Sequence, residues 1–233
     1  MTCALKCTTA SALLFLTIPA LSWSSPGIVV GFAGGLIKRD DVIHQEVQLA
    51  RHLNAQYALE LQVRMFENRS GKQARDEVLR LLDVNHDGRL SADEKRRARI
   101  AIYGHSWGAS EAVTLARALD REGIPVLLTV QVDSVQKKGE DDLWIPANVA
   151  QAANFYQTEG LLHGRREIRA ADPTRTQILG NFRLAYKSKP VSCEGYPWLA
   201  RMFWKPHIEI ECDPAVWRRV EELICSRLLP PAG

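Results

Sequence analysis

The sequence predicts an α/β fold, a mostly parallel β-sheet with helices covering both of its faces. Short apolar segments rich in β-branched residues alternate along the chain with segments of helical periodicity. Such alternation favours parallel strands joined by right-handed crossovers. One segment, 126–132 (VLLTVQV), carries no charge and is predominantly apolar, which is typical of a buried strand inside a parallel sheet.

The first half of the chain contains two strand–helix pairs. Each strand is a β-branched or roughly alternating segment, and each helix has apolar residues at spacings of three and four. We expect a strand at 27–32 that ends in glycines, a helix at 42–56, a strand at 57–66 and a helix at 72–82.

The same alternation continues in the second half, where a short β-branched strand leads directly into a long helix. We expect a strand at 99–103, a helix at 106–122, the buried strand at 126–132, a helix at 148–157, a short strand at 167–171 and a terminal helix opened by Asp213 or Pro214.

The composition is that of a single globular domain. The chain has 233 residues, of which 46% are hydrophobic and 24% are charged, close to the averages of soluble proteins. Thirty basic and 27 acidic residues leave a net charge of +3, and because the basic residues are scattered we expect no nucleic-acid partner. No uninterrupted apolar run reaches the ~18–20 residues of a membrane-spanning helix, so no transmembrane segment is expected.

Residues 1–24 have the pattern of a signal peptide. Lys6 precedes an apolar stretch at 12–21, and small residues follow where cleavage would occur. This interpretation predicts a secreted or periplasmic protein whose single domain spans 25–233. If the segment is instead a first strand, or upstream sequence attached by a misassigned start, the protein would be cytoplasmic.

Export would remove Cys3 and Cys7 and leave an odd number of cysteines, among which one disulfide could form. The sequence leaves the pairing among Cys193, Cys212 and Cys225 open. Because Cys225 falls in the predicted terminal helix and reads as a small buried hydrophobe, the pair to test is Cys193 with Cys212.

The strand at 99–103 runs into the motif GHSWG at 104–108, which matches the GxSxG pattern of a sharp strand-to-helix turn. Glycine is needed on both sides because a side chain there would collide with the neighbouring strand or helix. The turn would lift the Ser106 hydroxyl above the sheet at a helix N-terminus, where developing negative charge is stabilised. These features predict that Ser106 is a nucleophile, the alternative being a plain tight turn with a helix cap.

With this motif, an aspartate after the next strand and a late histidine, the chain resembles the α/β-hydrolase superfamily over most of residues 27–226. The resemblance implies the order serine, acid, histidine along the chain. It implies His207 as the general base, since no other histidine follows residue 163. Only about two strands precede the Ser106 strand, so the implied fold is a minimal α/β-hydrolase sheet of about five to six strands.

Two aspartates are candidates for the acid that orients His207. Asp133 directly follows the buried strand at 126–132 and would lie at the carboxyl edge of the sheet. Asp172 follows the predicted strand at 167–171 and would match the commoner family arrangement. We favour Asp133, because the residues after Asp172 also read as an ordinary turn or helix start.

The resemblance also implies an oxyanion hole with two backbone donors. One is the N–H of Trp107, the residue after the nucleophile. The other would come from the glycine-rich segment at 31–35, where Phe32 or Ala33 could point an N–H inward. Nucleotide binding is disfavoured at these glycines, since they do not form GxGxxG and no Lys-Ser/Thr pair follows them directly.

The segment 83–94 (DVNHDGRLSADE) matches the EF-hand loop at every specified position. It predicts a calcium site with oxygen ligands and a sharp turn at a glycine, the alternative being a merely polar loop. The predicted ligands are Asp83, Asn85, Asp87, Arg89 through its carbonyl, Ser91 and Glu94. Because a partner hand is missing from the sequence, we expect the ion to hold the fold rather than to act as a sensor.

The resemblance implies a serine hydrolase acting on a small-molecule or lipid substrate, either a carboxylic ester, a lipid ester or a thioester. The polar and aromatic segment at about 134–196 is where family members carry a lid or substrate-binding insertion. The alternative is a non-catalytic calcium-binding or scaffold protein on the same fold.

Overall fold

A six-stranded sheet forms the centre of the computed structural model, which describes residues 26–230. Neighbouring strands all pair in parallel, in the order β2-β1-β3-β4-β6-β8. The strands are β1 (Gly27–Ala33), β2 (Leu61–Glu67), β3 (Ile100–His105), β4 (Val126–Val132), β6 (Val149–Gln157) and β8 (Gln177–Leu184). The predicted α/β class and strand number are confirmed.

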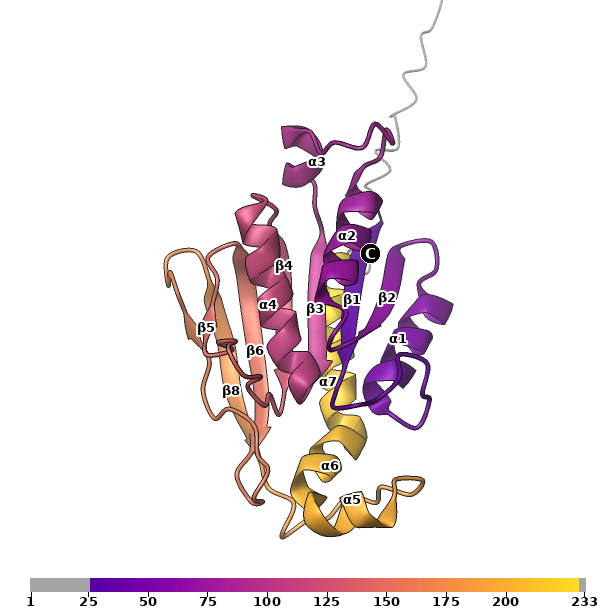
Figure 1. Cartoon of the computed structure of the whole chain (residues 1–233), viewed down its shortest axis with the longest axis vertical. Helices are drawn as coiled ribbons and strands as arrows, with labels where there is room; N and C mark the ends of the chain where they lie inside the picture. The colour runs from indigo at the N-terminus through magenta and orange to yellow at the C-terminus, as the bar shows by residue number, and fades with distance from the viewer. Residues whose placement is uncertain (1–25, 231–233) are drawn as a thin grey trace, which may run out of the picture.

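Helices cover both faces of the sheet (Figure 1). The helices α2 (Gly71–Leu82) and α4 (Trp107–Arg121) pack on one face, and α1 (Gln45–Gln56) and α7 (Pro214–Leu228) pack on the other. The middle strands are buried on both faces, as the apolar character of 100–102 and 126–132 requires. Two apolar layers therefore stabilise the sheet, one under each pair of helices.

The strand order places a topological switch point between β1 and β3. From β1 the chain runs outward to β2 and then returns past β1 to form β3. Crossovers on opposite faces leave a crevice at the carboxyl ends of such strands, which is where open α/β sheets bind ligands. The chain leaves β1 at Gly34 and leaves β3 at Ser106, so both residues lie at this crevice.

The prediction of a helix at 148–157 is wrong, because this segment is the strand β6 between β4 and β8. Its Ala- and Gln-rich composition suits a helix, but pairing on both edges and burial of both faces decide its structure. The segment 134–196 thus supplies β6 and β8 of the central sheet and is only partly an addition to it. The strand expected at 167–171 is reduced to β7 (Arg169–Ala170), which pairs with β5 (Trp144–Ile145) apart from the main sheet.

Two short helices, α5 (Trp198–Phe203) and α6 (Lys205–Cys212), lie at the lower end of the molecule in Figure 1. A disulfide joins Cys193 to Cys212, with Cα atoms 5.6 Å apart, and confirms the favoured pairing. Asp213 caps α7 by accepting the Ala215 N–H at 2.8 Å, as expected for the start of the terminal helix. The disulfide and the cap fix both sides of the point where α6 meets α7.

The loop 83–94 lies at the opposite end, where it leads through α3 (Ala92–Arg96) into β3 (Figure 1). Within residues 26–230, no helix combines the length and the apolar character that crossing a membrane requires. The predicted signal peptide at 1–24, with Cys3 and Cys7, lies outside the described residues.

Candidate active site

Ser106 sits on a strained turn between β3 and α4. Its backbone has φ 55° and ψ −123°, outside the regions that L residues favour, at a cost of about 1–3 kcal/mol. Ser106 is the N-cap of α4, yet its side chain makes no capping hydrogen bond. The hydroxyl is therefore free to meet a partner above the sheet.

Gly104 and Gly108 are both required by close backbone packing. A Cβ on Gly104 would collide with the backbone of Gly108, and a Cβ on Gly108 would lie 2.8 Å from the carbonyl oxygen of Ala33 and closer still to that of Phe32. Contacts this short do not occur for real Cβ atoms. The expected reason for glycine on both sides of Ser106 is confirmed.

His207 lies between Ser106 and Asp133. Its Nε2 is 3.0 Å from Ser106 Oγ, and its Nδ1 is 2.7 Å from Asp133 Oδ2. These three residues, hereafter the triad, come from the turn after β3, from α6 and from the end of β4, and all are buried. His207 belongs to the short helix α6, and Pro206 in the first turn of that helix starts it without needing an N–H.

Asp133 is held by four hydrogen bonds. Its Oδ1 accepts the backbone N–H groups of Gln157 (3.1 Å) and Gly164 (2.8 Å), and its Oδ2 accepts the Gln157 side-chain amide (2.8 Å) besides the His207 ring. Since a carboxylate only accepts, this arrangement puts the ring proton on Nδ1 and leaves Nε2 to accept from Ser106.

Asp172 lies elsewhere. Its carboxylate accepts the N–H and hydroxyl of Thr174, at 2.9 and 2.6 Å, within a turn. These bonds lower the pKa of Asp172. The structure thus brings Asp133, and not Asp172, to His207.

The two predicted oxyanion-hole donors lie in different backbone environments. Trp107 is the first residue of α4, where backbone N–H groups lack partners inside the helix. Phe32 and Ala33 belong to β1, which pairs with β2 as far as Ala33 and with β3 as far as Phe32. The backbone beside Ser106 is that of Gly34, since a Cβ there would lie 3.2 Å from the Ser106 Cβ. The second donor therefore stays a prediction for this segment.

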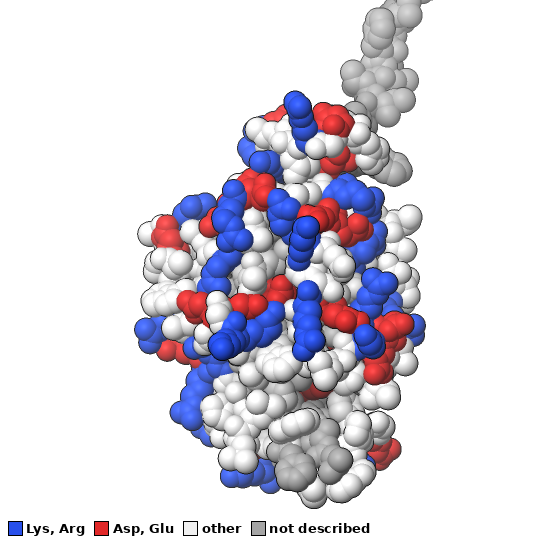
Figure 2. Space-filling view, viewed as in Figure 1, with Lys and Arg blue, Asp and Glu red and all other residues white. Residues whose placement is uncertain are grey.

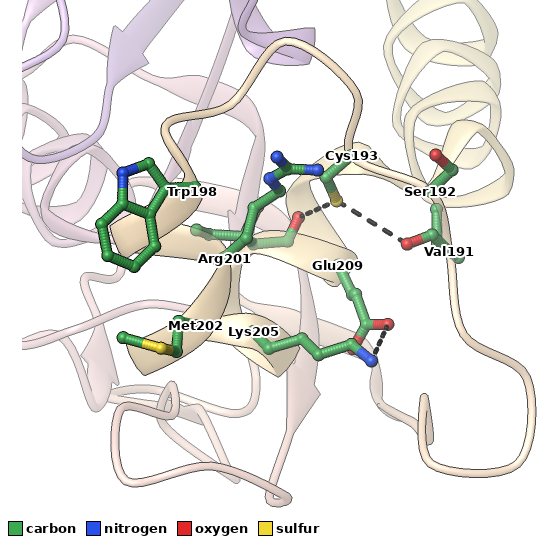
Figure 3. Close-up of a pocket in the computed structure, with 9 residues that line it drawn as sticks. Val191, Ser192, Cys193, Trp198, Arg201, Met202, Lys205 and Glu209 are labelled. Atoms are coloured by element: carbon green, nitrogen blue, oxygen red, sulfur yellow. Dashed lines mark hydrogen bonds and ion pairs between the residues drawn. The ribbon is translucent and has the colours of Figure 1, made fainter.

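A pocket of about 390 Å³ opens beside α6 (Figure 3). Trp198 and Met202 of α5 and Lys205 and Glu209 of α6 line it, whereas Ser106 and His207 do not. Trp198, Met202 and Trp204 are each more than half exposed. Figure 2 shows fewer charged side chains toward this end of the molecule than over its middle. Exposed apolar side chains therefore border the helix that carries His207.

The 83–94 loop has the local geometry of a tight oxygen-lined turn. Gly88 has φ 77°, Asp83 accepts the N–H of Gly88 at 2.9 Å, and Glu94 accepts the N–H groups of Val84 at 3.0 Å and Ser91 at 2.8 Å. The carboxylate, amide, hydroxyl and carbonyl oxygens fit the chemistry of calcium. The loop carboxylates are not among the described side chains that gather closely enough to hold an ion, so calcium binding stays a prediction.

Sequence reasoning missed the residues that support the triad. Gln157 is the last residue of β6, which pairs with β4, the strand that Asp133 follows. Had 148–157 been predicted as a strand, the sequence would have placed Gln157 at the carboxyl edge of the sheet, near Asp133. His105 lies inside the GHSWG motif, and its ring packs 4.7 Å, centroid to centroid, from that of His207. Glu211, whose Oε2 lies 3.5 Å from His105 Nδ1, belongs to no sequence motif.

Comparisons with known proteins concern the fold alone. No family model matches the chain, and no curated protein matches its sequence. Among solved structures it is similar to a thermostable esterase from Pseudomonas putida (12% identity, TM-score 0.45, covering 91% of this chain and 77% of that one). It is also similar to human thioesterase 2 (10% identity, TM-score 0.44, covering 86% of this chain and 95% of that one). A third similar structure is the RedJ thioesterase of prodiginine biosynthesis in Streptomyces coelicolor (11% identity, TM-score 0.42, covering 80% of this chain and 86% of that one).

Proposed function

We infer that the protein is a serine hydrolase that cleaves a carboxylic ester or thioester. The observation that carries this proposal is the position of His207, within hydrogen-bonding distance of both Ser106 Oγ and Asp133 Oδ2. A nucleophile, a base and a group that orients the base are the minimum for acyl transfer. The strained turn that holds Ser106 supports the same role, because such strain persists where the surrounding structure enforces it.

In the first half of the reaction, Ser106 Oγ attacks the carbonyl carbon while its proton passes to His207 Nε2. Asp133 stabilises the imidazolium through the Nδ1–H bond. The negative charge that develops on the carbonyl oxygen would meet the Trp107 N–H at the positive end of α4. His207 then gives its proton to the departing alcohol or thiol, which leaves an acyl group on Ser106.

In the second half, water replaces the alcohol or thiol. His207 takes a proton from the water, the resulting hydroxide attacks the acyl carbon, and Ser106 leaves with the proton returned by His207. The products are a carboxylic acid and the free enzyme.

The surface around α5 and α6 supports an acyl group that is apolar. Trp198, Met202 and Trp204 expose large apolar side chains next to the helix that carries His207. Lipid esters and other esters or thioesters with hydrocarbon acyl chains are therefore the substrate class that we propose.

Labelling of the folded protein with a fluorophosphonate tests the proposal, with Ser106→Ala as the control. We expect stoichiometric labelling of the wild type and none of the variant. Hydrolysis of short p-nitrophenyl esters should fall by ~10⁴–10⁶ in the variant, as for removal of a triad serine. If the wild type neither labels nor hydrolyses any ester or thioester tested, the non-catalytic scaffold is the better interpretation.

Export and calcium binding belong to the same proposal. The Cys193–Cys212 disulfide supports a secreted or periplasmic location, because disulfides persist in oxidising compartments. Calcium at such locations is concentrated enough to fill even a site with Kd of ~10⁻⁴–10⁻³ M. Because the 83–94 loop and the triad lie at opposite ends of β3, we propose a structural role for the ion.

A further inference from the structure

Four ionisable side chains gather beside the triad but outside it. They are His44 and Glu46 at the start of α1, His105 at the end of β3 and Glu211 near the end of α6, hereafter the buried cluster. His44 Nδ1 lies 2.5 Å from Glu211 Oε1, and His105 Nδ1 lies 3.5 Å from Glu211 Oε2. Ligand atoms of His44, Glu46 and Glu211 all fall within 4.8 Å of one another.

The cluster is removed from water. Glu46 is 0% exposed, Glu211 and His105 are each 2% exposed, and the His44 side chain is 14% exposed. Two adjacent carboxylates in such a place repel each other and lose their hydration, which is unfavourable unless a proton or cation compensates. Burial raises the pKa of Glu211 to about 7, and burial together with the nearby Glu211 charge raises that of Glu46 well above its ordinary value.

Two members of the buried cluster present polar atoms that lack a partner. Glu46 Oε2 and His105 Nδ1 make no hydrogen bond to any described residue, although both atoms are inaccessible to solvent. Buried polar atoms are almost always paired in native proteins. Burial also lowers the pKa of His105 well below its ordinary value, because it disfavours the charged imidazolium.

Surrounding groups orient the cluster as the outer partners of a metal site do. His44 Nε2 faces Asp41 Oδ2 at 3.8 Å, which leaves Nδ1 turned toward Glu211. Glu46 Oε1 accepts the Gly34 N–H at 3.2 Å, which leaves its other oxygen free. Carboxylate–histidine pairs and hydrogen-bonded carboxylates of this kind are typical around metal ligands.

The disulfide restrains the position of Glu211. The Tyr196 hydroxyl donates to Glu211 and lies 3.3 Å from His44 Nδ1. Tyr196 follows Cys193 by three residues and Glu211 precedes Cys212, so the disulfide restrains both. The carboxylate therefore has little freedom to turn away from the cluster.

We propose that the buried cluster is a binding site for one divalent transition-metal ion of the zinc class, held by His44, Glu46, Glu211 and His105. Two carboxylates and a divalent cation sum to zero charge, which removes the repulsion between the two glutamates. Two imidazoles and two carboxylates are ligands that zinc prefers, whereas calcium and magnesium select oxygen alone. The ion would link α1, β3 and α6. Because the His105 ring packs against the His207 ring, the ion would also restrain the position of His207.

Metal content and melting temperature of the untagged full chain test the site. The protein is stripped with a chelator, incubated with zinc chloride, freed of excess metal and analysed for bound zinc by mass spectrometry. We expect the buried cluster to bind one zinc ion per chain. A Glu94→Gln variant, which lacks one predicted ligand of the 83–94 loop, shows how much of the bound zinc belongs to that loop instead. The melting temperature should rise by about 5–10 °C at zinc a hundredfold above Kd.

Two cluster variants and one matched control identify the ligands. His44→Gln and Glu211→Gln should each weaken zinc binding by more than about tenfold, as expected for loss of one of four ligands. His52→Gln is the control, since His52 lies on the same helix in an exposed pair with Glu221 (3.0 Å) and should bind zinc as the wild type does. If Glu211→Gln does not fold, His44→Gln at the edge of the cluster carries the test.

Three results would overturn the proposal: no zinc retained by the folded wild type, wild-type zinc affinity in His44→Gln, or equal losses in His52→Gln. A wild type that takes up no metal and changes stability only with pH would mean that a shared proton holds the glutamates instead. Ser106→Ala should retain the zinc, so failure of the metal site and failure of the hydrolase proposal are distinguishable.

Discussion

Replacement of Asp133 by asparagine removes one negative charge and changes which atoms can donate a proton. Asp133 Oδ1 accepts two backbone N–H groups, those of Gln157 and Gly164. An asparagine must keep its carbonyl oxygen at this position, because an NH₂ group there would face two donors. The NH₂ group then takes the Oδ2 position, 2.7 Å from His207 Nδ1, where it faces one donor, the Gln157 side-chain amide, instead of two.

At that position the asparagine donates, so His207 Nδ1 must become the acceptor. The ring proton then moves to Nε2, which faces Ser106 Oγ at 3.0 Å and can no longer take its proton. The imidazolium also loses its counter-charge. A fall in turnover of roughly 10⁴-fold is expected, equivalent to about 5.4 kcal/mol at 1.36 kcal/mol per tenfold change.

The assay is hydrolysis of p-nitrophenyl esters by the wild type, by Asp133→Asn and by the control Asp172→Asn. We expect the control to keep nearly full activity, because the Asp172 carboxylate bonds to Thr174 within its own turn. Melting curves of both variants separate a loss of chemistry from a loss of structure. Equal and small losses in two folded variants would refute the assignment of Asp133.

Three further predictions concern other parts of the fold. Gly108→Ala should displace the turn at Ser106 and destabilise the protein by ~1–3 kcal/mol, the usual cost of overpacking, measured by denaturant unfolding; a stable, fully active variant would contradict the packing argument. Calcium a hundredfold above Kd should raise the melting temperature by about 5–10 °C over that in chelator, and Glu94→Gln should abolish the shift; an unchanged wild-type melting temperature would refute the site. Replacing Cys193 and Cys212 together by serine should lower stability by about 3 kcal/mol, as expected for a loop closed over a sequence separation of 19, and an unaffected unfolding midpoint would show that the disulfide does not restrain α6.

The turn at Ser106 could be predicted from the sequence because its determinants are local. Glycines at 104 and 108 bracket the serine, a β-branched segment precedes it and a helical period follows. The position of Asp133 followed from a segment whose apolar composition indicates burial on both faces. The cysteine pair was found by excluding Cys225, which lies in the regular terminal helix.

The strand β6 could not be predicted, because its local composition suits a helix and only its two neighbours decide otherwise. Pairing with β4 and β8 satisfies the backbone of 149–157 on both edges, and burial between them outweighs helix propensity. Gln157 was missed for the same reason. It is the last residue of β6, and it could be placed at the carboxyl edge of the sheet only once that segment was known to be a strand.

The sequence by itself determined the α/β class and the strained turn at Ser106, since periodicity and close glycines act between residues near each other in the chain. Tertiary structure alone decided that His207 reaches Ser106 across 101 positions and that His44 meets Glu211 across 167. These contacts arise where crossovers, helix packing and the disulfide bring distant segments to the carboxyl edge of one sheet. The free energy that holds them comes from burial of both faces of that sheet, which no local pattern records.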